Sequence, residues 1–140
     1  MEFWFSEHHT ENVKLSLKVD KHIYSEENEY LRIDVFDSYE YGRFIAIDGY
    51  IVTAEKDMFI YHEMLSHIPM AVHPSPRNIL VFGAGDGGVI DELVKYDSIE
   101  KIDLVEINDG VIEACRKYFP EVAVSLDDPR VNLYTDNALR

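Results

Sequence analysis

A glycine-rich loop constrains the fold of this chain more than any other feature. The segment 78–88 reads Asn-Ile-Leu-Val-Phe-Gly-Ala-Gly-Asp-Gly-Gly, so an apolar run leads into four glycines around one carboxylate. Gly83, Gly85 and Gly88 have the spacing G-x-G-x-x-G, which lets a backbone turn sharply, approach a ligand and pack a helix against a strand. The segment therefore predicts a strand, a tight loop and the start of a helix.

The residues after the loop continue the alternation of strands and helices. Apolar residues at helical spacing follow the loop, and a second helix is expected to stop at Pro120. The predicted elements are strand 78–82, a helix from 89 to about 96, strand 102–107, helix 111–118 and strand 131–134. This β-α-β-α-β order is half of a doubly wound parallel sheet, whose ligands bind beyond the carboxyl ends of the strands.

The chain before the loop predicts a different architecture. Residues 1–56 have the period-2 alternation of half-buried strands, and Asp48-Gly49 between two apolar runs predicts a hairpin. We therefore expect an N-terminal antiparallel β domain there. Residues 57–77 predict a helix and a proline-rich connector, and residues 78–140 a nucleoside-binding domain.

Composition limits the partners. The chain has 27 acidic residues against 13 Lys plus Arg and a net charge of −14, which argues against nucleic acid or an anionic membrane and suits cationic ligands. Solubility alone is the alternative explanation of this charge. Cys115 is the only cysteine, and no apolar run reaches the roughly 20 residues of a membrane span, so we expect a cytoplasmic protein.

Three carboxylates follow three successive predicted strands. Asp86 comes after the first, Glu106 ends the second and Asp136 comes after the third. Because carboxyl ends of parallel strands meet at one edge of a sheet, these side chains should border one crevice. Glu106 is placed to accept from ribose hydroxyls and Asp136 from an adenine amino group. The alternative for each is a helix cap or a turn.

Asp86 bears on the charge of the expected ligand. A dinucleotide would place its pyrophosphate against this loop, and a carboxylate within about 4 Å of that anion is repulsive. A sulfonium or a primary ammonium fits better, so ligands like S-adenosylmethionine are favoured over NAD. The alternative is that Asp86 turns away and caps the helix that follows.

No metal site is expected from the histidines of the first helix. His62 and His67 lie five residues apart, about 140° around a helix, whereas a zinc pair needs the spacing i, i+4. We therefore expect both to be surface or partly buried polar residues.

Five segments of the chain together point to a known family. They are 48–64 with Tyr61-His62-Glu63-Met64, 73–77, the loop 83–88, Val105-Glu106-Ile107 and 127–131. In this combination and order the chain resembles the spermidine synthase (polyamine aminopropyltransferase) family. The resemblance implies a Rossmann-like, methyltransferase-type α/β fold with a doubly wound sheet, incomplete after its third strand and preceded by a small antiparallel β domain.

The resemblance also implies a reaction and a donor site. The family transfers an aminopropyl group from decarboxylated S-adenosylmethionine, a co-substrate, to putrescine, giving spermidine and 5′-methylthioadenosine without a cofactor. By similarity, Asp86 holds the aminopropyl ammonium and Glu106 holds the ribose hydroxyls. Asp136 holds the adenine amino group, with Asn137 beside it.

Further site residues follow from the same resemblance. Gly83, Gly85 and Gly87 border the donor, while Tyr61, as an auxiliary catalytic residue, and His62 line the junction with the putrescine site. A homodimer or homotetramer through the N-terminal β domain is also expected.

The sequence departs from the family pattern at three points. Ala84 replaces a usual glycine, and Asn108 replaces a common acid, which puts a second ribose or methionine-side contact in doubt. The family's D-S-x-D-P segment, which supplies the base, is expected beyond residue 140. We therefore predict that these 140 residues alone lack normal transferase activity. The competing interpretations are an S-adenosylmethionine-dependent methyltransferase and a non-catalytic nucleoside-binding or oligomerisation module, and the preferred amine is not determined.

Overall fold

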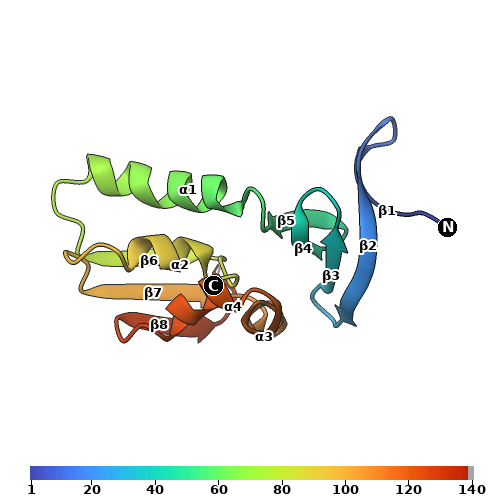
Figure 1. The fold of residues 1–140 in the computed structure, drawn as a ribbon. Coiled ribbons are helices and arrows are strands. Elements are labelled where there is room, and N and C mark those ends of the chain that lie inside the picture. The colour runs from blue at the N-terminus through green and yellow to red at the C-terminus, as the bar shows by residue number, and fades with distance from the viewer. Residues whose placement is uncertain (139–140) are drawn as a thin grey trace. The chain divides into compact units, whose positions relative to one another are not determined.

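Two units make up the chain, Met1–Met58 and Phe59–Arg140 (Figure 1). The computed structural model describes residues 1–138. The first unit is an antiparallel sheet and the second is an α/β unit with a parallel sheet, which confirms the predicted fold class. The division into segments 1–56, 57–77 and 78–140 stays a prediction.

The first unit is a five-stranded antiparallel sheet in the order β1-β2-β3-β4-β5. Its strands are β1 Phe3–Thr10, β2 Val13–Glu27, β3 Arg32–Ser38, β4 Gly42–Ile47 and β5 Tyr50–Ala54. The inward residues of these strands form one apolar cluster around Leu17, Val19 and Phe44, with Phe5 and Phe36 packed against it. The alternation seen in the sequence is thus the alternation of core and surface.

The predicted hairpin at Asp48-Gly49 is confirmed. The two residues join β4 to β5 with φ angles of 51° and 83°, and Ile47 pairs with Tyr50 across the turn. Positive φ at both central residues belongs to the type I′ turn, whose twist matches that of the flanking strands. The local sequence was sufficient here because the turn needs no distant partner.

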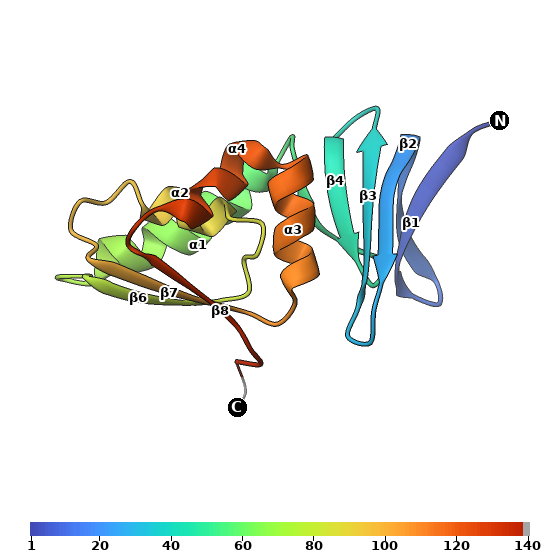
Figure 2. The same ribbon diagram turned by 90° about the horizontal axis from the view of Figure 1, so that it is seen from below.

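The second unit alternates helices with parallel strands in the order β6-β7-β8. Its elements are α1 Met58–Val72, β6 Asn78–Phe82, α2 Gly88–Leu93, β7 Lys101–Glu106, α3 Asp109–Tyr118, α4 Pro120–Ala123, the 3₁₀ helix η1 Val124–Asp127, and β8 Val131–Thr135. Figure 2 shows α2 and α4 on the same side of this sheet. Ile102 and Leu104 of β7 are fully buried, so the apolar core follows the middle strand.

Helix α3 ends at Tyr118, which confirms the predicted stop before Pro120. The chain re-enters helix at once, with Pro120 in the first turn of α4 and η1 following directly. Proline suits that position because its missing N–H would have no partner in the first turn and its fixed φ is helical. The end of α3 before Pro120 was therefore predicted, whereas the new helix that begins at Pro120 was not.

The first helix was predicted correctly, but its buried face is not the apolar one. The buried residues of α1 are His62, Ser66 and Met70. Of the apolar residues whose spacing predicts the helix, Met58 is half-buried and four are exposed: Tyr61, Met64, Leu65 and Ile68. No helix among residues 1–138 is long and apolar enough to span a membrane.

Candidate functional site

The glycine-rich loop joins β6 to α2 in an unusual backbone conformation. Gly83 and Gly87 have φ of 72° and 85°, and Ala84, which is not a glycine, has φ of 71°. Gly83 N–H donates to the carbonyl of Val105 at 2.9 Å, so the loop leaves the sheet only after one further inter-strand bond. The loop therefore lies at the carboxyl edge of the sheet, beside the end of β7.

Glu106, the last residue of β7, is buried beneath this loop. Its Oε2 accepts from Gly85 N–H at 3.1 Å, and its Oε1 accepts from the N–H groups of Ile107 at 2.8 Å and Asn108 at 3.3 Å. A Cβ at position 85 would lie 2.9 Å from Oε2, so the close approach needs glycine there. Hydrogen bonds to a charged group contribute about 1.5–3 kcal/mol each, which holds Glu106 in one orientation.

Asp86 lies in the loop and is also held by two partners. Its Oδ2 is 2.9 Å from Nε2 of His62 on α1, and its Oδ1 accepts from Gly88 N–H at 3.1 Å. The bond to Gly88 reaches the first residue of α2, but the N-cap of that helix is Gly87, so Asp86 is not the capping residue that the alternative expected. The contact with His62 was not foreseen, and it comes from a helix 24 residues earlier in the chain.

The pKa of the Cys115 thiol is affected by both carboxylates, Asp86 and Glu106. The thiol lies on α3 and is fully buried. Burial raises its pKa, and the negative charges of Asp86 and Glu106 raise it further. The thiol therefore stays protonated, and it is a core residue rather than a nucleophile.

The third predicted carboxylate, Asp136, follows β8 at the same edge of the sheet. Its backbone N–H donates to the carbonyl of Glu106 at 3.0 Å, so the chain after β8 is fixed beside the end of β7. Its side chain is exposed, and Oδ1 accepts from Asn137 N–H at 2.7 Å. Neighbouring parallel strands thus bring Glu106 and Asp136 together at this edge, as predicted from their positions at strand ends.

Tyr61 and His62 are adjacent in sequence but differ in exposure. Tyr61 is 59% exposed, whereas His62 is 3% exposed, and the two rings are 5.8 Å apart in an edge-to-face arrangement. The expectation that His62 is at most partly buried is therefore wrong. Its burial is explained by the bond to Asp86, which satisfies a polar ring atom inside the unit.

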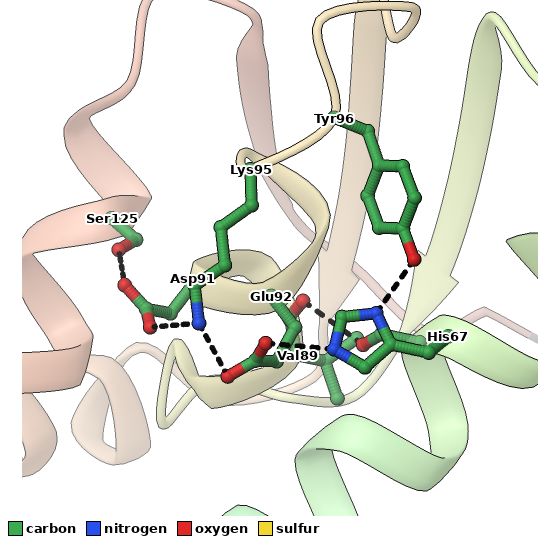
Figure 3. A network of polar contacts seen from close by, with 8 residues as sticks. His67, Val89, Asp91, Glu92, Lys95, Tyr96 and Ser125 are labelled. Carbon is green, nitrogen blue, oxygen red and sulfur yellow. Dashed lines mark hydrogen bonds and ion pairs between the residues drawn. The ribbon is translucent and has the colours of Figure 1, made fainter.

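A series of polar contacts, which the sequence analysis did not predict, joins α1 to α2. Ser66 donates to the carbonyl of Val89, and His67 lies 2.7 Å from the hydroxyl of Tyr96 and 3.0 Å from a carboxylate oxygen of Glu92 (Figure 3). The contacts continue through Lys95 and Asp91 to Ser125. The spacing of His62 and Ser66, four residues apart on one helix face, was the only signal in the sequence.

Asn108, where the resemblance leads us to expect an acid, has a structural role. Its side chain accepts from Gly110 N–H at 2.8 Å and caps the N-terminus of α3. Asn is among the preferred capping residues, so the substitution keeps this helix start.

Comparison with known proteins decides the family. Residues 58–140 match the family described as Spermine/spermidine synthase domain, and residues 3–55 match the one described as Spermidine synthase tetramerisation domain. The chain belongs to the spermine/spermidine synthase family. This membership confirms the resemblance inferred from the sequence.

Individual relatives of this family resemble the chain along its whole length. The polyamine aminopropyltransferases of Alkaliphilus oremlandii and Clostridium beijerinckii are each 51% identical over 140 residues, which is 100% of this chain and 49% of each relative. The crystal structure of spermidine synthase from Thermotoga maritima matches with a TM-score of 0.92 and 44% identity, over 96% of this chain and 48% of that one. A crystal structure of spermidine synthase in complex with the transition state analogue AdoDATO gives the same values. The chain thus spans about half the length of these relatives.

Proposed function

We propose that this chain binds the donor in an aminopropyl transfer from decarboxylated S-adenosylmethionine to putrescine. The observation that carries the proposal is the pair of carboxylates at the edge of the parallel sheet, Asp86 and Glu106, each oriented by backbone N–H groups of the glycine loop or its surroundings. Membership of the spermine/spermidine synthase family supports it. An anionic edge suits a donor that carries both a sulfonium and an ammonium.

In this proposal each carboxylate binds a different part of the donor. Asp86 binds the aminopropyl ammonium, Glu106 binds the ribose hydroxyls, and Asp136 with Asn137 binds the adenine. The exposed side chain of Asp136 and its place beside Glu106 support this division. Gly83, Gly85 and Gly87 border the donor, because a loop with few side chains lets a ligand approach the backbone closely.

The chemistry is a single displacement at carbon. The amine nitrogen of putrescine attacks the aminopropyl carbon bonded to sulfur, the C–S bond breaks, and its electron pair neutralises the sulfonium, which leaves as 5′-methylthioadenosine. The attacking nitrogen then gives up a proton. Because the leaving group is already activated, alignment of the two reactants is the main task of the protein.

The acceptor amine must be unprotonated to attack. A primary alkylammonium has a pKa of about 10.4, so at neutral pH a base has to receive its proton. We assign Tyr61 an auxiliary role at the junction of donor and acceptor, together with His62, and the exposure of Tyr61 supports this. The main base is expected outside these 140 residues, and the low activity of these residues alone stays a prediction.

Binding measurements on the natural protein test the donor site. Calorimetry should show that Asp86→Asn weakens decarboxylated S-adenosylmethionine by about 10–100-fold, the value of a hydrogen bond to a charged group. Binding of 5′-methylthioadenosine should change less than about twofold, because this ligand has no ammonium for Asp86 to bind. Glu106→Gln should weaken both ligands, because both carry the ribose.

The matched control is Asp103→Asn on β7, a carboxylate paired with Lys101 in the middle of the strand. It should leave both affinities unchanged. Equal losses for the two ligands in Asp86→Asn, or stronger binding of S-adenosylhomocysteine or NAD by the wild type, would rule out the proposed donor site.

We also propose that the first unit mediates self-association into a dimer or tetramer. The name of the family that matches residues 3–55 supports this. Val13, Leu15, Leu17 and Val19 alternate along β2 on one face, yet Val13 and Leu15 are exposed while the other two are buried. The apolar face of β2 thus extends beyond the core of its own unit.

Substitution on β2 tests the proposed assembly. Leu15→Lys should shift the natural protein to a smaller species in sedimentation, because a charge in an apolar interface is costly to desolvate. Lys14→Glu, on the opposite face of the same strand, is the control. An unchanged molar mass for Leu15→Lys would exclude β2 from the interface.

We place the protein in the cytoplasm. The support is that Cys115 is the only cysteine and is buried as a thiol, which fits a reducing compartment.

A further inference from the structure

The contact between His62 and Asp86 links helix α1 to the glycine loop. His62 is 3% exposed, and its Nε2 lies 2.9 Å from Oδ2 of Asp86. The other carboxylate oxygen accepts from Gly88 N–H at 3.1 Å. One oxygen is thus held by a side chain from α1 and the other by the backbone at the start of α2, so the carboxylate plane is fixed from two directions.

Gly88 makes room for this histidine. A Cβ at position 88 would lie 1.9 Å from Cε1 and 2.3 Å from Nε2 of His62, far inside contact distance. The φ of Gly88 is not positive, so the backbone conformation itself does not require glycine. The requirement is steric, because the imidazole occupies the space that any side chain at position 88 would fill.

We propose that His62 is a positioning residue, which acts on the ammonium of the donor by fixing the orientation of Asp86. The inference rests on the proposed function, in which Asp86 binds that ammonium. A carboxylate that keeps one rotamer loses little conformational entropy when it binds a cation, and the strength of the contact depends on its direction. Gly88 belongs to the same arrangement because its missing side chain admits the imidazole.

The rest of α1 supplies a comparison within the same helix. His67 is hydrogen-bonded to Glu92, near the end of α2 that is away from the loop, and to Tyr96, which follows that helix. Both histidines therefore help to dock α1, but only His62 contacts a carboxylate of the loop. If the two histidines only dock α1, replacing either one should have the same effect on donor binding. If His62 positions Asp86, only its replacement should weaken the donor selectively.

The test measures the affinities of the natural protein for decarboxylated S-adenosylmethionine and for 5′-methylthioadenosine. His62→Ala should weaken the first by about tenfold, equivalent to one hydrogen bond to a charged group, and the second by less than about twofold. His62→Gln, whose amide N–H can donate to Asp86, should recover most of the loss. Gly88→Ala should show the same selective loss as His62→Ala, and His67→Ala should show none.

A double-mutant cycle separates action through Asp86 from direct contact with the ligand. If His62 acts through Asp86, His62→Ala should have no further effect in the Asp86→Asn background. Additive losses, or equal weakening of both ligands by His62→Ala and His62→Gln, would overturn the proposal. If His62→Ala does not fold, the cycle is run with Gly88→Ala in place of His62→Ala, and a Gly88→Ala variant without selective loss overturns the proposal.

The two proposals fail in different ways. A wild type that does not distinguish the two ligands, or an Asp86→Asn variant that binds both normally, contradicts the proposed function. A normal Asp86→Asn effect with no selective effect in the His62 and Gly88 variants contradicts the positioning role alone.

Discussion

Ala84 holds a backbone conformation that is costly for any residue with a side chain. Its φ of 71° lies in the left-handed region, where the Cβ approaches the following carbonyl at a cost of roughly 1–2 kcal/mol. It stands between Gly83 and Gly85 in a loop that the bonds to Val105 and Glu106 hold in place. The left-handed conformation of Ala84 is therefore imposed by the hydrogen bonds of its two neighbours and is not the intrinsic preference of alanine.

Replacing Ala84 by glycine should stabilise the protein. Glycine removes the left-handed penalty but gains freedom in the unfolded chain, so the expected net gain is about 1 kcal/mol. Urea unfolding measures it. Ala71→Gly, at an exposed position near the end of α1, is the control and should destabilise by up to about 1 kcal/mol. If Ala84→Gly lowered the free energy of unfolding as Ala71→Gly does, Ala84 would not be strained.

At the scale of single elements, Arg130 connects parts of the second unit at the end of the sheet away from the loop. Its guanidinium forms a two-point contact with Asp128 and donates to the carbonyls of Val94 at 2.7 Å, Tyr96 at 3.1 Å and Ile99 at 3.4 Å. The carbonyls at the end of a helix have no partner within it. Arg130 thus closes α2 and the connection to β7 while it anchors the start of β8.

Arg130→Lys should destabilise the protein by about 2 kcal/mol, because an ammonium cannot reproduce the planar fork and loses bonds to the backbone carbonyls. Chemical denaturation gives the value. The control is Arg116→Lys, which alters an exposed two-point ion pair with Asp127 and should cost less than about 1 kcal/mol. Similar losses for both would show that the carbonyl contacts of Arg130 contribute little.

Elements whose signals are local were predictable from the sequence, and contacts between distant segments were not. The turn at Asp48-Gly49 and the loop from Gly83 specify their own backbone, and the alternating strands specify their faces. By contrast, the end of α3 before Pro120 was predictable, but the new helix that Pro120 begins depends on the packing of α4 and η1. The exposed apolar side of α1 shows the same limit, since periodicity identifies a helix without identifying what covers it.

The candidate site divides in the same way. Parallel topology placed Glu106 and Asp136 at one edge of the sheet, and this followed from strand order alone. The bond from His62 to Asp86 depends on which face of α1 packs against the rest of the unit. The sequence pattern indicated the apolar residues of α1 as that face, whereas His62 is the residue that is buried. No spacing rule covers such a contact between elements so far apart in the chain.

At the scale of the whole molecule, charge is the dominant property. The net charge is −14, and in the proposed function the donor and the acceptor are both cations. A field of this sign raises the local concentration of cations around the protein and speeds their association. The contribution is spread over many surface carboxylates, so it differs from the short-range contacts of Asp86 and Glu106.

Salt separates these two contributions. The Debye length falls from about 30 Å at 0.01 M to about 3 Å at 1 M ionic strength, which screens the distributed charge while short contacts at a partly buried carboxylate are screened much less. Between these limits, decarboxylated S-adenosylmethionine and putrescine should bind several-fold more weakly to the natural protein, whereas neutral 5′-methylthioadenosine should bind almost equally. The Asp86→Asn variant should keep much of the salt dependence, because the long-range field remains. If the Asp86→Asn variant bound these cations independently of salt, the electrostatic attraction would come from Asp86 alone. The other surface carboxylates would then not contribute to substrate binding.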